Sequence, residues 1–335
     1  MIQATAPGRC GLIGNPTDMY GGSVISCSTV ERAKCTLEPS TRDISIEVSG
    51  ERQVISKRED LALAGDRLDV ARAVLKALSI EPGSTEPFTL TATTDVPMQA
   101  GLAGSTAIIA TITGALLAHL KYSLNRYQTA ELVRRVEDEY MGTVCGFQDQ
   151  YMTVFGGLNY LDFRGKNSAE RQNAASPFAT VEPLQAYVGQ LPIVLAHTGV
   201  KRHSGVVHKS LRDRWLEGDP EAIDGFNRIE HLARLGKKAL LVGDWTALGE
   251  LMTENHAIVR DLGGSGEANE YLIRTALENG ATAAKLAGAG GGGTILALTL
   301  RPEFTVKALV QAGADAILYP SSSPGLAVST TATPA

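Results

Sequence analysis

The stretch of sequence that decides the fold reads Pro97-Met98-Gln99-Ala100-Gly101-Leu102-Ala103-Gly104-Ser105-Thr106-Ala107. Its glycines let backbone N–H groups come close to an anion, and a helix that starts here adds unpaired N–H groups and a positive dipole end. The hydroxyls of Ser105 and Thr106 are able to reach a phosphate oxygen or a magnesium ion. No Gly-Lys-Ser/Thr follows, so this is not a Walker A loop. Taken alone, the stretch equally fits a small-residue turn with a Ser/Thr helix cap.

The segments around this loop predict an α+β protein. An apolar strand at 88–94 precedes the loop, and residues 108–120 are apolar nearly all round, which indicates a buried helix. Alternating or apolar runs predict further strands at 24–37, 44–48, 191–196, 283–287, 294–299 and 316–318. Helical patterns cover 132–140, 204–216, 220–241 and 245–260. Asp219-Pro220 supplies an N-cap followed by proline at the first helical position.

The character of the chain changes near residues 180–190. With 335 residues, the chain is long enough for two domains that each have a core. We expect an N-terminal domain at 1–185 and a C-terminal domain at 186–320. Residues 321–335 are rich in Ser, Thr, Pro and Ala and carry hardly a charge, so a loose, flexible tail is expected there.

The composition argues against several classes of function. There are 31 Lys and Arg against 36 Asp and Glu, a net charge of −5, so no basic surface is available for nucleic acid. No long apolar run predicts a membrane span, and the N-terminus does not resemble a signal peptide. The four cysteines show no C-x-x-C pair and no zinc spacing, which is typical of reduced thiols. We therefore expect a cytoplasmic monomer or homodimer without nucleic-acid or membrane partners.

Two further stretches are unusual in composition. Residues 287–293 hold five glycines in seven residues between two apolar strands. Because glycine costs backbone entropy on folding, either a binding role or a flexible surface loop explains them. Residues 6–22 bring Asn15, Thr17, Asp18 and Tyr20, which are able to bind hydroxyl groups, into one turn-rich stretch. By itself, Asn-Pro-Thr-Asp is more typical of a plain turn.

Together the three stretches resemble, in order and spacing, the three signatures of the GHMP kinases. The resemblance covers most of residues 1–300 and is greater still to plant-type glucuronokinases. It is carried by Gly14-Asn15-Pro16-Thr17-Asp18-Met19-Tyr20-Gly21-Gly22, where galactokinases have Glu-His in place of Asn-Pro, and by the glycine loop, where Ala103 and Thr106 replace the usual serines. Segments 146–149, 156–163 and 204–216 fit as well. This resemblance implies the two-domain GHMP kinase fold, with the active site in the interdomain cleft.

The resemblance also implies roles for individual residues. Asp149 would be the catalytic aspartate that holds and deprotonates the substrate hydroxyl, although an Asp at this position also fits a helix cap. Arg9 would offset charge near the transferred phosphate. Glu137 and Ser105 would bind Mg²⁺, with Asp138 or Glu139 as alternatives to Glu137. The implied ATP-binding residues are Pro97, Gly101, Leu102, Ala103, Gly104, Ser105, Thr106, Ala107, Gly290 and Gly291, and the implied substrate-binding residues are Asn15, Asp18, Tyr20, Gly21 and Gly22.

The implied activity is an ATP- and Mg²⁺-dependent phosphorylation of the anomeric hydroxyl of a sugar, with D-glucuronate as the expected substrate. A glucuronate carboxylate requires an additional cation, and the glucuronokinase-like segment offers Lys201, Arg202, Arg212 and Arg214. Other interpretations stay open. They are a sugar 1-kinase for galactose, fucose or a heptose phosphate, a decarboxylase on the same fold, and a non-catalytic sugar sensor.

Overall fold

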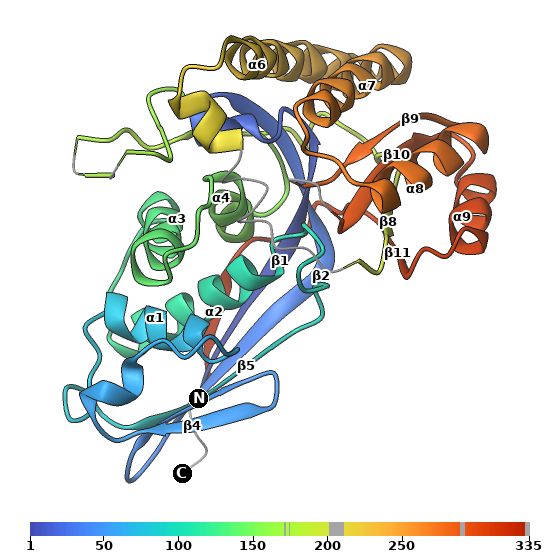
Figure 1. Ribbon diagram of the computed structural model, residues 1–335. Coiled ribbons are helices and arrows are strands. Elements are labelled where there is room, and N and C mark those ends of the chain that lie inside the picture. The colour runs from blue at the N-terminus through green and yellow to red at the C-terminus, as the bar shows by residue number, and fades with distance from the viewer. Residues whose placement is uncertain (171, 174, 201–210, 289–291, 332–335) are drawn as a thin grey trace.

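Two β-sheets with helices packed on them make up the protein (Figure 1). The structure is a computed structural model, and it describes residues 1–170, 172–173, 175–200, 211–288 and 292–331. Strands and helices are mixed along the chain without regular βαβ alternation, so the predicted α+β class is confirmed. Among the described helices, none is both long enough and apolar enough to cross a membrane.

The larger sheet has eight strands in the order β12-β1-β2-β5-β3-β4, with β6 on β2 and β7 on β6. The strands are β1 (Ile2–Ile13), β2 (Ser23–Pro39), β3 (Ile44–Val48), β4 (Glu51–Ile55), β5 (Phe88–Thr94), β6 (Leu158–Asp162), β7 (Thr180–Pro183) and β12 (Ala327–Thr330). All of its ladders are antiparallel except the one between β3 and β5. The predicted strands at 24–37, 44–48 and 88–94 are present, whereas β1 lies where the sequence predicts only turns.

Helices cover one face of this sheet and form the first core with it (Figure 1). They are α1 (Asp69–Ala77), α2 (Gly104–His119), α3 (Arg126–Arg135) and α4 (Gln148–Phe155), with short helical turns η1 (Thr17–Tyr20), η2 (Arg58–Leu61) and the π-helical η3 (Val136–Tyr140). Helix α2 is buried along nearly its whole length, as its uniformly apolar sequence predicts. It starts directly at the glycine loop, so the core fixes the position of that loop.

The smaller sheet has four strands in the order β11-β8-β10-β9. These strands are β8 (Ile193–His197), β9 (Ala281–Leu286), β10 (Thr294–Thr299) and β11 (Ala316–Leu318), and the helices are α6 (Pro220–Val242), α7 (Trp245–Asp261), α8 (Glu267–Glu278) and α9 (Pro302–Gln311). Asp219 caps α6 as predicted, with its side chain accepting from the N–H of Glu221. Residues 211–216 of the predicted helix at 204–216 are helical, and 204–210 lie outside the described residues.

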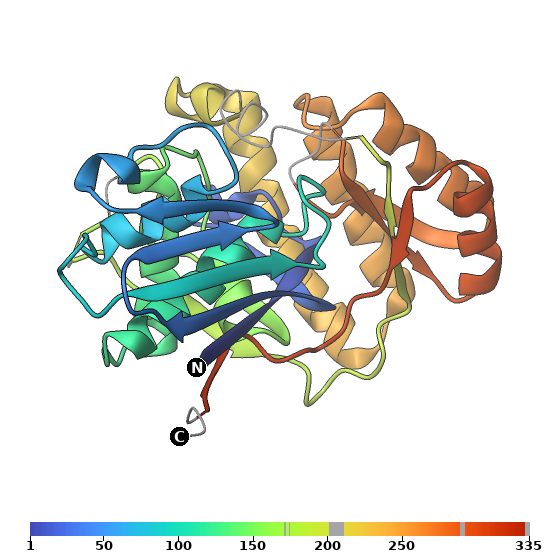
Figure 2. The same cartoon turned by 90° about the horizontal axis from the view of Figure 1, so that it is seen from below.

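The predicted loose tail is wrong over residues 321–331. Strand β12 pairs with the start of β1, and Ser321 donates its N–H to the carbonyl of Ser28 at 2.8 Å. Leu326 donates to the carbonyl of Val154 at 3.1 Å, at the carboxyl end of α4. Figure 2 shows this segment running from the small sheet back to the N-terminal strand. Composition failed here because backbone hydrogen bonds hold most of the segment, and Leu326 adds a side chain to the first core.

Candidate functional site

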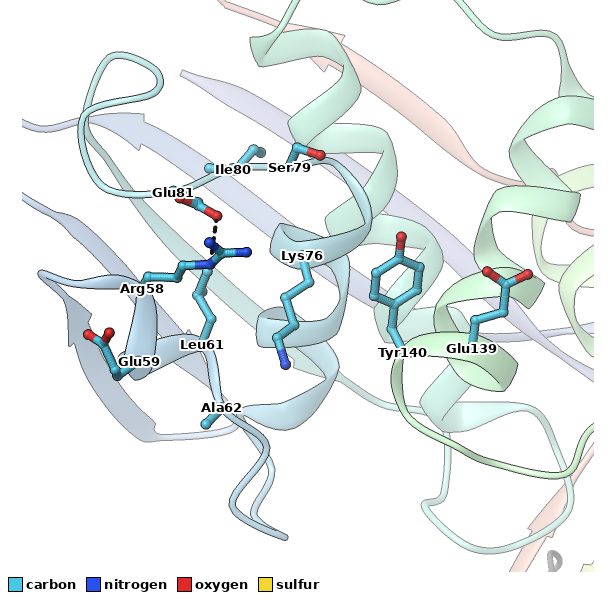
Figure 3. A pocket seen from close by; sticks show the side chains of 10 residues that line it. All are labelled: Arg58, Glu59, Leu61, Ala62, Lys76, Ser79, Ile80, Glu81, Glu139 and Tyr140. Atoms are coloured by element: carbon cyan, nitrogen blue, oxygen red, sulfur yellow. Dashed lines mark ion pairs between the residues drawn. The ribbon is translucent and has the colours of Figure 1, made fainter.

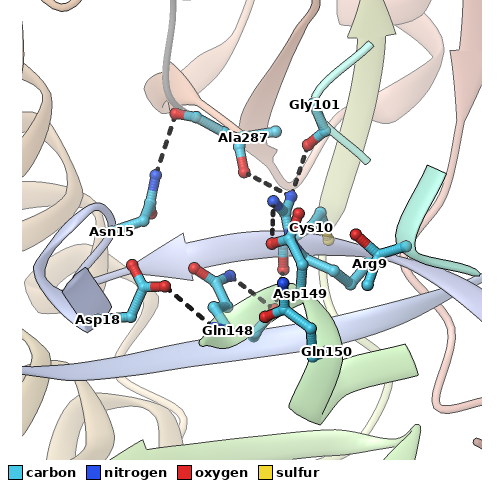
Figure 4. Close-up of polar contacts among 12 residues, drawn as sticks. Arg9, Cys10, Asn15, Asp18, Gly101, Gln148, Asp149, Gln150 and Ala287 are labelled. Carbon is cyan, nitrogen blue, oxygen red and sulfur yellow. Dashed lines mark hydrogen bonds and ion pairs between the residues drawn. The ribbon is translucent and has the colours of Figure 1, made fainter. Parts of the chain in front are cut away.

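Arg9 stands at the point where the three sequence motifs meet (Figure 4). On β1, its side chain is 7% exposed and donates from Nε and Nη2 to Oδ1 of Asp149 at 2.8 and 2.5 Å. Its Nη1 donates to the carbonyl of Gly101 at 2.5 Å and to that of Ala287 at 3.4 Å. One guanidinium therefore connects the catalytic candidate, the glycine loop and the start of the third motif.

The glycine loop packs so closely on β1 that position 8, directly before Arg9, has to be glycine. A Cβ at Gly8 would lie 2.9 Å from the carbonyl oxygen of Leu102 and equally near the side chain of Val96. The N–H of Arg9 donates to that same carbonyl at 3.0 Å. Any side chain at position 8 would push the loop away from β1 and break the contacts that Arg9 makes with it.

Asp149 lies in the first turn of α4, and another residue caps this helix. Oδ2 of Asp18 accepts from the N–H groups of Phe147 and Gln148 at 2.8 and 3.0 Å. Gly146 has to be glycine because its Cβ would meet Oδ2 of Asp18 at 1.9 Å. Asp18 thus provides the cap that was the alternative role for Asp149, and the carboxylate of Asp149 is paired with Arg9 instead.

Asp18, a candidate for substrate binding, also has a structural contact, because its carboxylate is bonded to the start of α4. Its side chain is buried, and burial raises the pKa of its carboxyl from 3.8 to about 6 against the lowering effect of the two backbone N–H groups. The nearby Asp149 raises this pKa further, whereas Arg9 lowers it. Asp18 therefore holds α4, and through it Asp149, in position, which makes it a positioning residue in this arrangement.

The glycine loop presents the start of α2 without a competing side chain. Ala103, the N-cap residue, has a left-handed backbone (φ 62°) and makes no side-chain capping bond, and the first turn carries no acidic residue. Pro97 packs behind it, with its carbonyl 3.2 Å from the position that a Cβ on Gly104 would take. Helix α2 has 16 residues, and its positive end and first-turn N–H groups are open at the loop. They are therefore available to an anion bound there.

Glu137 is the one buried carboxylate of the acidic triplet on η3. Its Oε1 accepts from Oγ1 of Thr106 at 2.9 Å, and its Oε2 accepts from Nε2 of Gln150 at 2.5 Å. Burial raises the pKa of Glu137 from 4.5 to about 7, and the charge of Asp149 adds to this. Asp138 pairs with Arg134, and Glu139 pairs with Arg135. In the described structure the hydroxyl beside Glu137 is that of Thr106 rather than the expected Ser105.

The first and third motifs are joined through Asn15 and a buried lysine. Nζ of Lys285 donates to Oδ1 of Asn15 at 2.8 Å and to the carbonyl of Leu286 at 2.6 Å. Nδ2 of Asn15 donates to the carbonyl of Gly288 at 3.3 Å. Lys285 is 1% exposed, and burial lowers its pKa from 10.5 to about 7. The candidates Gly290 and Gly291 lie outside the described residues.

The remaining substrate candidates lie at the end of η1. Gly21 ends this turn with φ 81°, and the N–H of Gly22 bonds back to the carbonyl of Thr17 at 2.9 Å. These two glycines shape the turn. The ring of Tyr20 stacks on Phe226 with centroids 4.5 Å apart and is tilted against Trp215 at 5.1 Å. Tyr20 therefore links η1 to helices of the C-terminal half.

A cavity of about 470 Å³ lies away from these residues, between η2, α1 and η3 (Figure 3). Its lining includes Arg58, Lys76 and Glu81, together with Glu139 and Tyr140 from the same turn that carries Glu137. Of the predicted site residues, only Glu139, an alternative to Glu137 as a metal ligand, is in its lining.

Several residues of the site escaped the sequence analysis. Lys285 is the single charged residue in an otherwise uncharged strand, and a charge at such a position could have indicated a functional residue. Gln150 follows the catalytic candidate directly, but glutamine carries no charge and attracts no attention in a sequence. Asn255 of α7 accepts from the N–H of Gly14 at 2.9 Å, and Asn269 of α8 accepts from that of Gly292 at 2.7 Å. These two asparagines lie far from the loops in sequence, and nothing local marks them.

Family models match both halves of the chain. The GHMP kinases N terminal domain matches residues 68–157, and the GHMP kinases C terminal domain matches residues 237–315. The first interval contains the glycine loop, Glu137 and Asp149, and the second contains Lys285 and the third motif.

Known proteins resemble the chain over most of its length. Probable glucuronokinase 2 of Arabidopsis thaliana is 31% identical over 303 residues, which are 84% of this chain and 81% of that protein. D-glycero-alpha-D-manno-heptose 7-phosphate kinase of Campylobacter jejuni is 25% identical over 87% of each chain. The crystal structure of Lactococcus lactis galactokinase with galactose has a TM-score of 0.77 over 97% of this chain and 95% of that one, at 18% identity, which shows a shared fold. The chain therefore belongs to the GHMP kinase family and is a phosphotransferase.

Proposed function

We propose that this kinase transfers the γ-phosphoryl group of ATP to the anomeric hydroxyl of D-glucuronate, giving the sugar 1-phosphate and ADP. The observation that carries the proposal is the Arg9–Asp149 pair beside the open start of α2. Phosphoryl transfer requires a held nucleophile and stabilised phosphate charge more than it requires covalent chemistry from the protein. These two requirements correspond to the aspartate and to the loop.

Each group has one task in the proposed reaction. The backbone N–H groups at 101–107 hold the phosphates of ATP at the helix start. Oδ2 of Asp149 accepts the proton of the substrate hydroxyl while Oδ1 stays bonded to Arg9. The guanidinium of Arg9 also offsets the charge that develops near the transferred group. The hydroxyl oxygen forms the new P–O bond as the bond from phosphorus to the β-phosphate oxygen breaks.

The residues around Glu137 fit a magnesium ion. They offer a carboxylate and a hydroxyl, which are hard oxygen ligands, and the buried Oε1 of Gln150 has no hydrogen-bond partner among the described residues. An ion here would supply positive charge to neutralise the phosphates of ATP. We propose Glu137 and Thr106 as its protein ligands, with Thr106 in place of Ser105.

Glucuronate is proposed on the likeness to the Arabidopsis protein and on the cations of the segment around 212. The experiment is an ATP-consumption screen over free sugars, uronic acids and sugar phosphates, with the phosphate position of the product assigned by NMR. We expect the highest kcat/KM for glucuronate. Preference for a neutral sugar by about tenfold or more, or for a heptose phosphate, would reject the uronic acid and leave the kinase assignment intact. Sugar binding without any ATP turnover would instead favour a sensor.

A further inference from the structure

Among the described residues, the buried phenol hydroxyl of Tyr20 has no hydrogen-bond partner. Its ring is fixed on two sides by Phe226 and Trp215. A buried hydroxyl without a partner is uncommon in native proteins and calls for an explanation. A bound ligand that offers an acceptor oxygen would supply one.

Tyr20 lies close to the reacting groups proposed above. It belongs to the same short turn as Asp18, whose carboxylate caps the helix that carries Asp149. The charges of both Asp149 and Arg9 act on Asp18. A sugar held with its reacting hydroxyl at Asp149 can therefore extend along η1 toward Tyr20.

Arg212 belongs to the helical segment 211–216, which contacts Tyr20 through Trp215, three positions after Arg212. Residues three apart share one face of a helix, so Arg212 and Trp215 point to the same side. Burial raises the pKa of the Tyr20 phenol, as do the charges of Asp18 and Asp213, while the charge of Arg212 lowers it. The guanidinium is thus within electrostatic reach of the phenol.

The other cations of this segment differ from Arg212. Arg214 donates from Nε to Asp219 at 2.6 Å, from Nη2 to Glu221 at 2.8 Å and from Nη1 to the carbonyl of Leu262 at 3.2 Å. It is therefore committed to the start of α6. Lys201 and Arg202 lie outside the described residues. Arg212 is half-buried, and within the described ranges no carboxylate pairs with it.

We propose that Arg212 and Tyr20 form an anion subsite that binds the carboxylate of the sugar substrate and so selects uronic acids over neutral sugars. The inference rests on the proposed function and names the residues that give it its specificity. Arginine suits this task because its planar fork binds both oxygens of a carboxylate. The phenol hydroxyl of Tyr20, at the end of η1, donates a further hydrogen bond to the same carboxylate. In the pyranose form of a hexuronate the carboxylate on C5 and the anomeric hydroxyl on C1 lie on either side of the ring oxygen, so they occupy neighbouring but separate subsites.

The test is a ratio of two specificity constants, kcat/KM for glucuronate divided by kcat/KM for glucose, measured on one preparation of each enzyme. Because both constants scale with the folded fraction, the ratio does not depend on stability. We expect Arg212→Gln to lower it by about 10–100-fold, mainly through KM for glucuronate, since a charge-assisted hydrogen bond is lost. Arg212→Lys should recover part of the loss, and Tyr20→Phe should lower the ratio by about threefold or more. Arg214→Gln, which removes the same charge from the same helix, should leave it unchanged.

Ratios within about twofold of the wild-type value in both Arg212→Gln and Tyr20→Phe would overturn the subsite. Failure of the proposed function looks different. If the wild-type enzyme prefers a sugar phosphate and Arg212→Gln removes that preference, the anion subsite stands and glucuronate is the wrong substrate. If the wild-type enzyme prefers a neutral sugar, and Arg212→Gln leaves every ratio of charged to neutral substrate unchanged, both proposals are wrong.

Discussion

Arg9 binds a single oxygen of Asp149: its Nε and Nη2 both donate to Oδ1, at 2.8 and 2.5 Å. Within the described part of the chain, no hydrogen bond reaches Oδ2. The side chain of Asp149 is 33% exposed, against 7% for Arg9. One oxygen is thus fixed from the protein side, and the other stays available to a hydroxyl that arrives from solvent.

Asp149→Asn should lower kcat by about 10²–10⁴-fold, because an amide cannot accept the proton of the substrate hydroxyl. ATP affinity should hardly change, since the phosphates are assigned to backbone N–H groups at 101–107. The helix cap is left intact because Asp18 provides it. The variant should therefore fold, with some loss of melting temperature from the weakened contact with Arg9. Steady-state kinetics, nucleotide titration and a melting curve check these outcomes together.

Asp18→Asn is the matched comparison for that experiment, since it alters the true cap of α4. An amide oxygen still accepts from backbone N–H groups, so we expect a smaller loss of kcat than in Asp149→Asn. A folded Asp149→Asn enzyme with kcat within about threefold of wild type would show that this carboxylate has no role in the chemistry.

Arg9→Lys should reduce both kcat and ATP affinity, in contrast to Asp149→Asn. Lysine keeps the charge but lacks the fork that reaches Asp149 and the carbonyl of Gly101 at once. Loss of the contact with Gly101 loosens the glycine loop, and a lost donor at the reacting centre typically costs about 10²–10³-fold in kcat. Nucleotide titration separates the two effects. Unchanged ATP affinity would mean that the contact with Gly101 does not hold the loop.

Chelation of divalent metal should abolish turnover, and added Mg²⁺ should restore it. Thr106→Val and Glu137→Gln should each raise the Mg²⁺ concentration for half-maximal rate by about tenfold or more. Ser105→Ala is the control, because its hydroxyl is not the one bonded to Glu137. A titration of rate against Mg²⁺ distinguishes the variants. A large effect of Ser105→Ala without one of Thr106→Val would return the ligand role to Ser105.

Lys285 should make folding stability depend on pH above neutrality. Its pKa is lowered to about 7 by burial, from 10.5, so the unfolded state binds more protons between pH 7 and 10.5. The lysine's contribution to the free energy of unfolding is thus greatest above pH 10.5 and is lost as pH falls through 7. Lys285→Met removes this slope, so the stability of wild type relative to the variant should increase from pH 7 to 10.

Urea denaturation at several pH values measures this difference. Lys238→Met is the control, because Lys238 lies exposed on α6. Equal slopes for wild type and Lys285→Met would show that Lys285 stays protonated in the folded enzyme over the whole range.

The helices and strands that could be predicted are those whose own residues show a clear apolar pattern. The buried helix α2 and the strands β3 and β5 follow from uniform or alternating apolar residues, and the limits of β5 match the prediction. Strand β1 was missed because Pro7, Gly8 and Gly11 interrupt its pattern. Gly8 is required because the glycine loop packs directly on the strand, and Gly11 because a Cβ there would lie 2.9 Å from Oδ1 of Asn15 and from Nε2 of Gln148. Strand β12 was missed because its partners lie more than 300 positions away in the sequence.

The motifs of the site could be predicted from the sequence, but the hydrogen bonds and ion pairs between their residues could not. The sequence indicates Arg9, Glu137 and Asp149 as candidates, but it does not indicate which side chains they contact. Whether Ser105 or Thr106 faces Glu137 depends on the phase of α2, since neighbouring residues on a helix point about 100° apart. The contact of Asp18 with a helix 129 positions away could not be predicted either, because such a capping contact has no local signature in the sequence.

The path of residues 320–331 has a consequence for how the enzyme is made. Gly325 packs against the end of α4 so closely that a Cβ there would lie 2.1 Å from the carbonyl oxygen of Val154. The helix that carries Asp149 thus receives contacts from a segment that leaves the ribosome after every strand of both sheets except β12 has been translated. Domains tend to fold as they emerge, beginning at the N-terminus. A nascent chain stopped before Pro320 would hold every proposed catalytic group and still lack the contacts on α4, so activity should emerge only after this segment has been translated.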